Sequence, residues 1–322
     1  MPFNIRHWAW LARNGHIESP PMELGPFPFA VMTDKEEIQL HEDLKQWGIL
    51  VENTLTDEAK DLLNAIAHVN EWTIRGLALL YAKKTNAVRE FDTSSDEFGL
   101  VHAVRDVPRV PFSVTVTKSE VITAFSTLES LLVTRHRRRT DVVSQVGVIL
   151  RTILDPEGNW SPWKSTPVSL PYGTVKDILK DKELSALILD DVKDTKHKED
   201  PDETETVDVT VTDQRTKQAK GIQKVLRGSE APAYTATQLS ELAKYPVSTM
   251  VQMGISYSTA QGVVEPDAST GIMYLEGAGV VVSYARGRSE ETRVIRYVPG
   301  DDKGFIEGVQ SLVTLADPPQ RR

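Results

Sequence analysis

The sequence contains no cysteine among its 322 residues. This absence excludes disulfides, a cysteine nucleophile and thiolate-bound zinc or iron–sulfur sites, and it gives no sign of an oxidising compartment. Long apolar runs are lacking too. The longest early one, Trp8–Ala12, is too short for a signal peptide, and no window reaches the roughly 20 apolar residues of a membrane span. We therefore expect a cytoplasmic protein without membrane insertion.

Basic residues are fewer than acidic ones. The chain has 37 Lys and Arg against 46 Asp and Glu, a formal net charge of −9, which disfavours nucleic-acid binding as its main task. With 40% hydrophobic and 26% charged residues the composition is that of a globular protein. The length is enough for one large domain, or two packed halves, with a substantial core.

Motifs for catalysis are absent. The segment 276–287, EGAGVVVSYARG, lacks the third glycine of a dinucleotide-binding loop and continues as a strand, so a hairpin is favoured. Ser256 follows Gly254 but has no glycine two residues later, as a hydrolase elbow requires. The seven histidines show no metal-ligand spacing. We therefore predict no catalytic, cofactor-binding or metal-binding residues, and not an enzyme; a binding function is favoured, with a hydrolase ranked last.

Helices and strands are indicated by periodicity and capping residues. The first half predicts a strand over 7–13, a helix starting at a Thr33–Glu36 capping box, and a helix from Thr56. Strands are expected over 71–83 and 98–107, separated by the polar loop 84–97, and a strand from 109 runs into a helix capped by Thr117 and Glu120. The segment 142–150 is compatible with strand or helix, and we favour helix. The basic run 135–139, RHRRR, fits a helix C-terminus better than a patch for RNA, phosphates or an acidic partner.

The second half predicts a group of helices followed by strands. Helices are expected from Thr174 and over about 214–227 and 235–245, strands over 251–258, 270–277, 279–286 and 292–298, and a terminal helix carrying Phe305. Between the first two helices, residues 190–213 are rich in Asp and Glu and poor in bulky apolar groups, so we expect a mobile acidic loop.

A weak internal repeat relates the two halves, about 1–150 and 151–322. Laying Arg109 on Arg293 without gaps aligns five identities, and each copy is expected to be a strand followed directly by a helix. The sequence therefore indicates a pseudo-twofold α+β protein, in which each half gives strands to one sheet and helices to its own bundle.

The order of several segments resembles a known family, the ESX secretion-associated protein EspG of actinobacterial type VII secretion. The resemblance is carried by HWAWLARNGHI (7–17), GPFPFAV (25–31), LKQWGI (44–49), VPRVPFSVTVTKSEVITA (107–124), GAGVVVSYARGR (277–288) and RVIRYVPGD (293–301). It extends over most of the chain as a single domain, 1–322, and the acidic segment 190–213 departs from the family pattern.

The resemblance implies a central antiparallel β-sheet flanked by two α-helical bundles, and no enzymatic activity. EspG proteins are cytosolic chaperones that bind PE–PPE heterodimers at the hydrophobic tip of the PPE protein. Because an exposed apolar tip would self-associate, covering it keeps the substrate soluble until the secretion machinery receives it. A PE–PPE heterodimer is therefore the expected partner.

The family's partner surface is formed by the loop between its second and third strands and by its C-terminal helical bundle, which are similar in position to 84–97 and 171–246 here. The resemblance thus suggests eight partner-binding residues: Val88, Arg89, Phe91, Asp92, Gln223, Leu226, Arg227 and Ser229. Phe91 either anchors an apolar partner or folds back onto the sheet.

Two further expectations stay open at this point. The free protein is expected to be a monomer or a weak homodimer. The alternative function is a non-enzymatic interaction or regulatory module with a different protein partner, whose binding through Arg135–Arg139 would be sensitive to salt.

Overall fold

The computed structural model describes residues 3–18, 24, 32–81, 108–127, 130–180, 206–229, 231–289 and 291–316. The chain forms two compact units. Unit 1 comprises Met1–Ile149, Met250–Ser269 and Leu312–Arg322, and unit 2 comprises Leu150–Thr249 and Thr270–Ser311. A large antiparallel sheet combined with several helices confirms the predicted α+β class. Within the described residues, no helix is both long and apolar enough to span a membrane.

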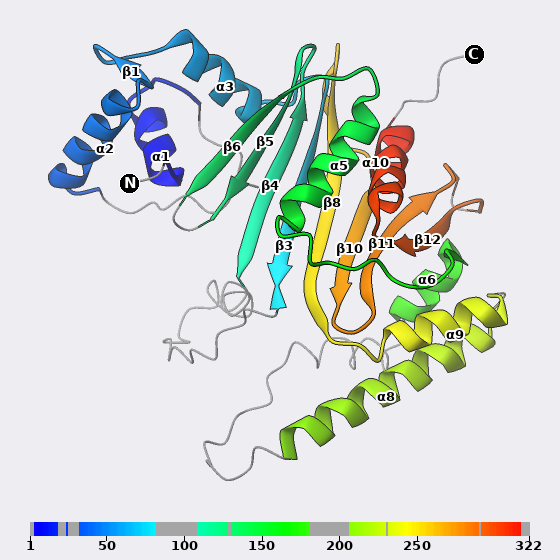
Figure 1. Cartoon of the computed structure of the whole chain (residues 1–322). Helices are drawn as coiled ribbons and strands as arrows, with labels where there is room; N and C mark the ends of the chain where they lie inside the picture. The colour runs from blue at the N-terminus through cyan, green and yellow to red at the C-terminus, as the bar shows by residue number, and fades with distance from the viewer. Residues whose placement is uncertain are drawn as a thin grey trace. The chain divides into compact units, whose positions relative to one another are not determined.

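Unit 1 is built on antiparallel strands in the order β6-β5-β4-β3-β8, with β9 paired to β8 (Figure 1). Their bounds are β3 Trp72–Leu80, β4 Arg109–Val116, β5 Glu120–Ser126, β6 Leu131–Arg137, β8 Val247–Thr259 and β9 Gly262–Val264. In β5, three successive residues, Ile122, Thr123 and Ala124, are at most 3% exposed, so this strand is covered on both faces. Continuous burial of this kind replaces the alternation of a half-exposed strand.

Three helices of unit 1 pack against β5 and β6. They are α1 Ile5–Arg13, α2 Asp34–Gln46 and α3 Asp57–Ala67, accompanied by the small hairpin of β1 Leu50–Val51 and β2 Thr54–Leu55. Their core includes Trp8, Leu44 and Ile66 together with Ile122 and Leu131 of the strands. The capping box predicted at Thr33 and Glu36 is confirmed: each side chain bonds the other residue's backbone.

The strand predicted over 7–13 is wrong, because α1 occupies this segment. The Asn4 side chain accepts from the backbone N–H of Arg6 at 2.9 Å, and the Nδ1 atom of His7 accepts from the Asn4 N–H at 3.1 Å. This reciprocal cap starts a helix whose Trp8 and Leu11, three residues apart, are fully buried. The alternation of tryptophans that indicated a strand is a coincidence of spacing.

The helix predicted after Thr117 is also wrong. The Thr117 hydroxyl accepts from the Glu120 N–H at 3.0 Å, and the Thr117 N–H donates to the Glu120 carbonyl at 2.9 Å, which closes a tight turn into β5. Pairing of β5 with β4 and β6 overrides the helical spacing of Val121 and Phe125. The repeat is corrected with it, because Arg109 begins a strand–strand pair whereas Arg293 precedes a strand–helix pair.

Unit 2 has the antiparallel strand order β10-β11-β12-β7. Its elements are β7 Val168–Pro171, α6 Tyr172–Lys180, α8 Thr206–Arg227, α9 Ala233–Leu242, β10 Ser269–Leu275, β11 Gly279–Arg286, β12 Val294–Pro299 and α10 Asp302–Ala316. One face, with Val168 and Val281, packs on Leu239 and Leu242 of α9. The opposite face packs on α10, where the Thr270 hydroxyl donates to the Gly308 carbonyl at 3.2 Å.

The remaining predictions divide into three groups. The four C-terminal strands, the terminal helix and the helical interpretation of 142–150 are confirmed, the last as α5 Val142–Leu154. The end of the expected acidic loop is corrected, since α8 begins at Thr206 and makes 206–213 helical; extending an existing helix costs less than nucleating one. The rest of that loop, 190–205, and the segments 84–97 and 98–107 lie outside the described residues.

Candidate partner-binding site

The helices α8 and α9 form an antiparallel hairpin in unit 2 (Figure 1). Leu226 of α8 and Ala236 of α9 are both buried and pack with Leu170 of β7 in one apolar cluster. Half-buried Ile222 and Leu239 extend this cluster on the two helices. The hairpin is thus attached to the sheet through its inner face.

The corner between α8 and α9 is held by Ser229. Its hydroxyl donates to the Leu226 carbonyl at 2.8 Å and accepts from the Ala231 N–H at 3.2 Å. Its own N–H donates to the same Leu226 carbonyl at 3.3 Å. Since these contacts satisfy polar groups left open at a helix end, Ser229 shapes the corner from within.

The four predicted residues of this region are therefore brought together but differ in exposure. Arg227 is exposed and Gln223 is half-buried, so both present polar atoms at the end of α8. Leu226 is 0% exposed and belongs to the core of the hairpin, which makes it a support for the surface and not part of it. The other four predicted residues, Val88, Arg89, Phe91 and Asp92, lie outside the described residues.

Tyr234, in the first turn of α9, was not identified from the sequence. It is 51% exposed, and its hydroxyl lies 2.7 Å from the Thr166 hydroxyl and 3.2 Å from that of Ser165. Hydrogen bonds from Ser165 and Thr166 lower the pKa of Tyr234 from its ordinary value. Its ring is thereby oriented at the surface, which is an arrangement suited to contact with an apolar partner.

Two further exposed apolar residues follow α9. Tyr245 and Val247 are each 37% exposed. Tyr245 lies against the β10–β11 turn, where a side chain on Gly277 would come within 3.3 Å of its ring. The turn is joined to the same segment by the Glu276 N–H, which donates to the Pro246 carbonyl at 2.9 Å. The surface after α9 therefore combines exposed apolar side chains with a backbone that is held in place by hydrogen bonding. In the sequence, the aromatic residue before Pro246 is the signal that could have indicated this surface.

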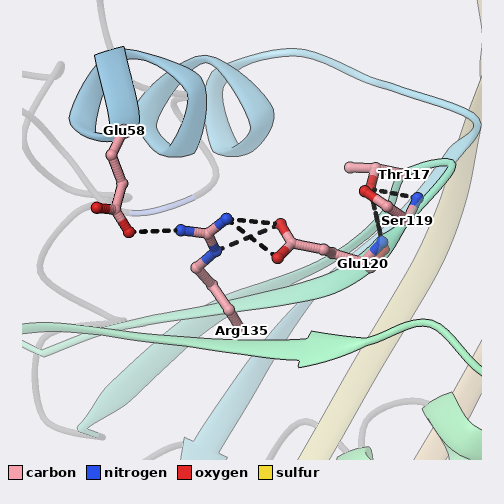
Figure 2. A network of polar contacts seen from close by, with 5 residues as sticks. All are labelled: Glu58, Thr117, Ser119, Glu120 and Arg135. Carbon is pink, nitrogen blue, oxygen red and sulfur yellow. Dashed lines mark hydrogen bonds and ion pairs between the residues drawn. The ribbon is translucent and has the colours of Figure 1, made fainter. Parts of the chain in front are cut away.

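The basic run 135–139 was predicted to end a helix, and this prediction is wrong. The run belongs to the edge strand β6 and the residues after it. Figure 2 shows Arg135 between two carboxylates: its Nη1 donates to Glu58 at 2.9 Å and its Nη2 donates to both oxygens of Glu120 at 3.0 Å. The hydrogen bond to Glu120 contributes most to raising the pKa of Arg135, and the charges of Glu120 and Glu58 raise it further. Strand pairing of β6 with β5 decides this outcome, because it brings Arg135 opposite Ile122 and beside Glu120.

Arg138 is neutralised in the same way. Its guanidinium forms a two-pronged ion pair with Glu71, and its Nη1 also donates to the Thr117 carbonyl at 2.8 Å. The ion pair lowers the pKa of Glu71 and raises that of Arg138. With two of its arginines paired to three carboxylates, this run offers much less net charge to a polyanion than its sequence suggests.

The segments that mimic catalytic motifs have structural roles. The glycines at 277 and 279 have positive φ angles, +87° and +101°, and form the β10–β11 hairpin, as predicted. Ser256 lies within β8, where its hydroxyl donates to Glu265 at 3.4 Å. No group of three or more potential metal ligands occurs in the part of the chain that the structure describes.

Comparisons with known proteins identify a fold. No protein-family profile matches the chain, and no curated protein does. Among solved structures, it is similar to the Mycobacterium tuberculosis type VII secretion system chaperone EspG5 in complex with the PE25–PPE41 dimer, with a TM-score of 0.65 and 11% sequence identity. The match covers 99% of this chain and 98% of that chain. It shows a common fold over practically the whole length of both proteins.

Proposed function

We propose that this protein is a cytoplasmic, non-enzymatic chaperone of type VII secretion that binds a PE–PPE heterodimer at the hydrophobic tip of the PPE protein. The observation that carries the proposal is the end-to-end fold match to EspG5, a chaperone whose structure was solved with a PE–PPE dimer. The order of the sequence segments that resemble EspG supports it independently of the fold.

Two contact regions are proposed separately, the outer side of the α8–α9 hairpin and the segment 84–97. Within the hairpin, Gln223 and Arg227 supply polar contacts and Tyr234 an apolar ring, while Leu226 and Ser229 hold the corner. An aromatic anchor surrounded by polar contacts is the usual composition of a strong protein interface. In the loop, Val88, Arg89, Phe91 and Asp92 stay as proposed contacts.

The test is coexpression with the PE–PPE pair encoded nearest to this protein, followed by size-exclusion chromatography. A soluble species with one copy of each of the three chains, lost when this chain is omitted, is the expected result. If the pair elutes alone or stays insoluble with each pair tried, the alternative of an interaction module with a different partner replaces the proposal.

Variants locate the surface. Replacing Phe91 with Ala, or Arg227 with Glu, is expected to weaken the complex at least tenfold without unfolding the protein, because interface anchors are worth about 1.4 kcal/mol or more. Lys118→Glu is the matched control: it makes the same charge change at an exposed residue in the β4–β5 turn. Equal affinity of the Phe91 and Arg227 variants with the control would refute this assignment of the surface, although not the chaperone function.

A further inference from the structure

A hollow of about 520 Å³ lies on unit 2 away from the α8–α9 hairpin. It is lined by Ser169, Arg286, Gly287, Thr292, Val294 and Arg296. Its volume is within the range of about 300–1,000 Å³ typical of small-molecule sites. All of its lining residues come from β7, from the ends of β11 and β12, and from the connection between these two strands.

The strand register places both arginines on the same face of the sheet. Arg296 of β12 is paired with Tyr284 of β11 on one side and with Ser169 of β7 on the other, and Arg286 is paired with Val294. Cross-strand partners direct their side chains to one face, and residues two positions apart on a strand share it. This is also the face on which α10 packs, because Tyr284 donates its hydroxyl to Glu307 of that helix.

The charge of the hollow contrasts with that of the whole chain. Among the residues that the structure describes, no lining residue is acidic, whereas the protein carries a net charge of −9. Glu307 lies nearby: its carboxylate accepts from the Tyr284 hydroxyl and forms long ion pairs with Lys303 at 3.9 Å and with Arg296 at 4.0 Å. Two positive side chains therefore line the hollow, with Glu307 beside Arg296, while Glu291, next to Thr292 in the chain, is exposed.

The backbone around the hollow is tightly constrained. Gly287 has a φ angle of +103°, and a side chain there would approach the Thr292 carbonyl oxygen to 2.4 Å. The Ser289 hydroxyl lies 2.7 Å from that of Thr292, which closes the connection between β11 and β12. Since both arginines extend from paired strands, their backbone needs little ordering before a ligand binds.

We propose that this hollow is a binding site for a small oxyanion, a phosphoryl or carboxylate group, held by the guanidinium groups of Arg286 and Arg296 with a hydroxyl donor from Ser169. Planar guanidinium groups match the oxygen spacing of both anions and bind them with paired, charge-assisted hydrogen bonds. Neutralising two neighbouring positive groups adds to the attraction. The inference does not depend on the proposed chaperone function.

The test is a titration of the full chain at low ionic strength with inorganic pyrophosphate and, separately, with succinate, followed by calorimetry and by the amide NMR signal of Gly287. Saturable binding of at least one anion that shifts this signal is expected; pyrophosphate alone identifies a phosphoryl ligand, and succinate alone a carboxylate. Arg286→Gln and Arg296→Gln should each weaken binding at least tenfold, whereas Arg137→Gln, at an exposed arginine of β6, should not.

A fourth variant guards against loss of folding. Ser169→Asp places a carboxylate in the hollow and should abolish anion binding while the circular dichroism spectrum stays that of the wild type. Absence of saturable binding by both anions, or equal binding by the Arg286 variant and the Arg137 control, would overturn the proposal.

Discussion

Replacing Leu226 with Ala tests whether this residue supports the candidate surface from within the core or forms part of the surface itself. Leu226 is 0% exposed and packs between Leu170 of β7 and Ala236 of α9, so the substitution leaves a cavity at the base of the α8–α9 hairpin. Leu-to-Ala changes at such sites cost about 2–5 kcal/mol of unfolding free energy. We expect about 3 kcal/mol here, because β7 is short and α9 can move only by losing its contacts with the sheet.

The neighbouring substitution Arg227→Ala is the matched control. Arg227 is exposed, and surface truncations of this kind stay within about 0.5 kcal/mol of the wild type. Urea unfolding followed by far-ultraviolet circular dichroism measures both variants, and linear extrapolation gives the two free energies. In partner binding we expect a different pattern: Arg227→Ala weakens the complex although its stability is that of the wild type, whereas Leu226→Ala acts on binding only through its loss of stability.

A Leu226 variant as stable as the wild type would refute this reasoning. It would mean that the side chain is not enclosed by β7 and α9, so that the hairpin packs on the sheet in another way. A large loss of stability in the Arg227 variant would refute it equally, because that residue would then belong to the core.

Two predictions concern folding in the remaining parts of the chain. Burial lowers the pKa of His7 below its ordinary value of 6.5, against the hydrogen bond and charge of Asp43. The unfolded chain then binds a proton that the folded one does not, so below pH 6.5 the free energy of unfolding falls by up to about 1.4 kcal/mol per pH unit. Urea unfolding should show this slope reduced in His7→Gln, and an unchanged slope in that variant excludes His7 as its source. Replacing Gly279 with Ala, at a φ angle of +101° and with a Cβ only 2.5 Å from the Ser161 carbonyl oxygen, should cost about 2–4 kcal/mol. Gly277→Ala meets only a side chain at 3.3 Å, so thermal unfolding should place it between Gly279→Ala and the wild type, and equal effects would contradict the backbone clash.

Local signals predicted the elements whose stabilising contacts are close in sequence. The Thr33–Glu36 box starts α2 as expected, because both partners of the cap lie within one turn. The glycines at 277 and 279 bound a hairpin since positive φ angles there need no distant partner. The β-branched and aromatic residues of β10 and β11 were also sufficient to predict strands.

Two errors occur where a distant strand decides between two local possibilities, unlike that at 7–13, where the local cap at Asn4 starts a helix. The Thr117–Glu120 pattern suits a helix cap and a tight turn equally, and only the pairing of β5 with β4 and β6 selects the turn. The same pairing places Arg135 in a strand beside Glu58 and Glu120, which converts an apparent basic patch into ion pairs. Sequence spacing carries no information about partners 15 and 77 residues away.

For this protein, composition and local periodicity by themselves determined the α+β class, the lack of thiol chemistry and most helix and strand positions, because these depend on residue type and on neighbours within a few turns. Tertiary structure alone decided which residues at the end of α8 are buried and support the candidate surface, and which are exposed on it. The reason is that Leu226 is buried only by packing against β7 and α9. It also brought Arg286 and Arg296 into one hollow, because strand register, and not sequence, fixes which side chains share a face.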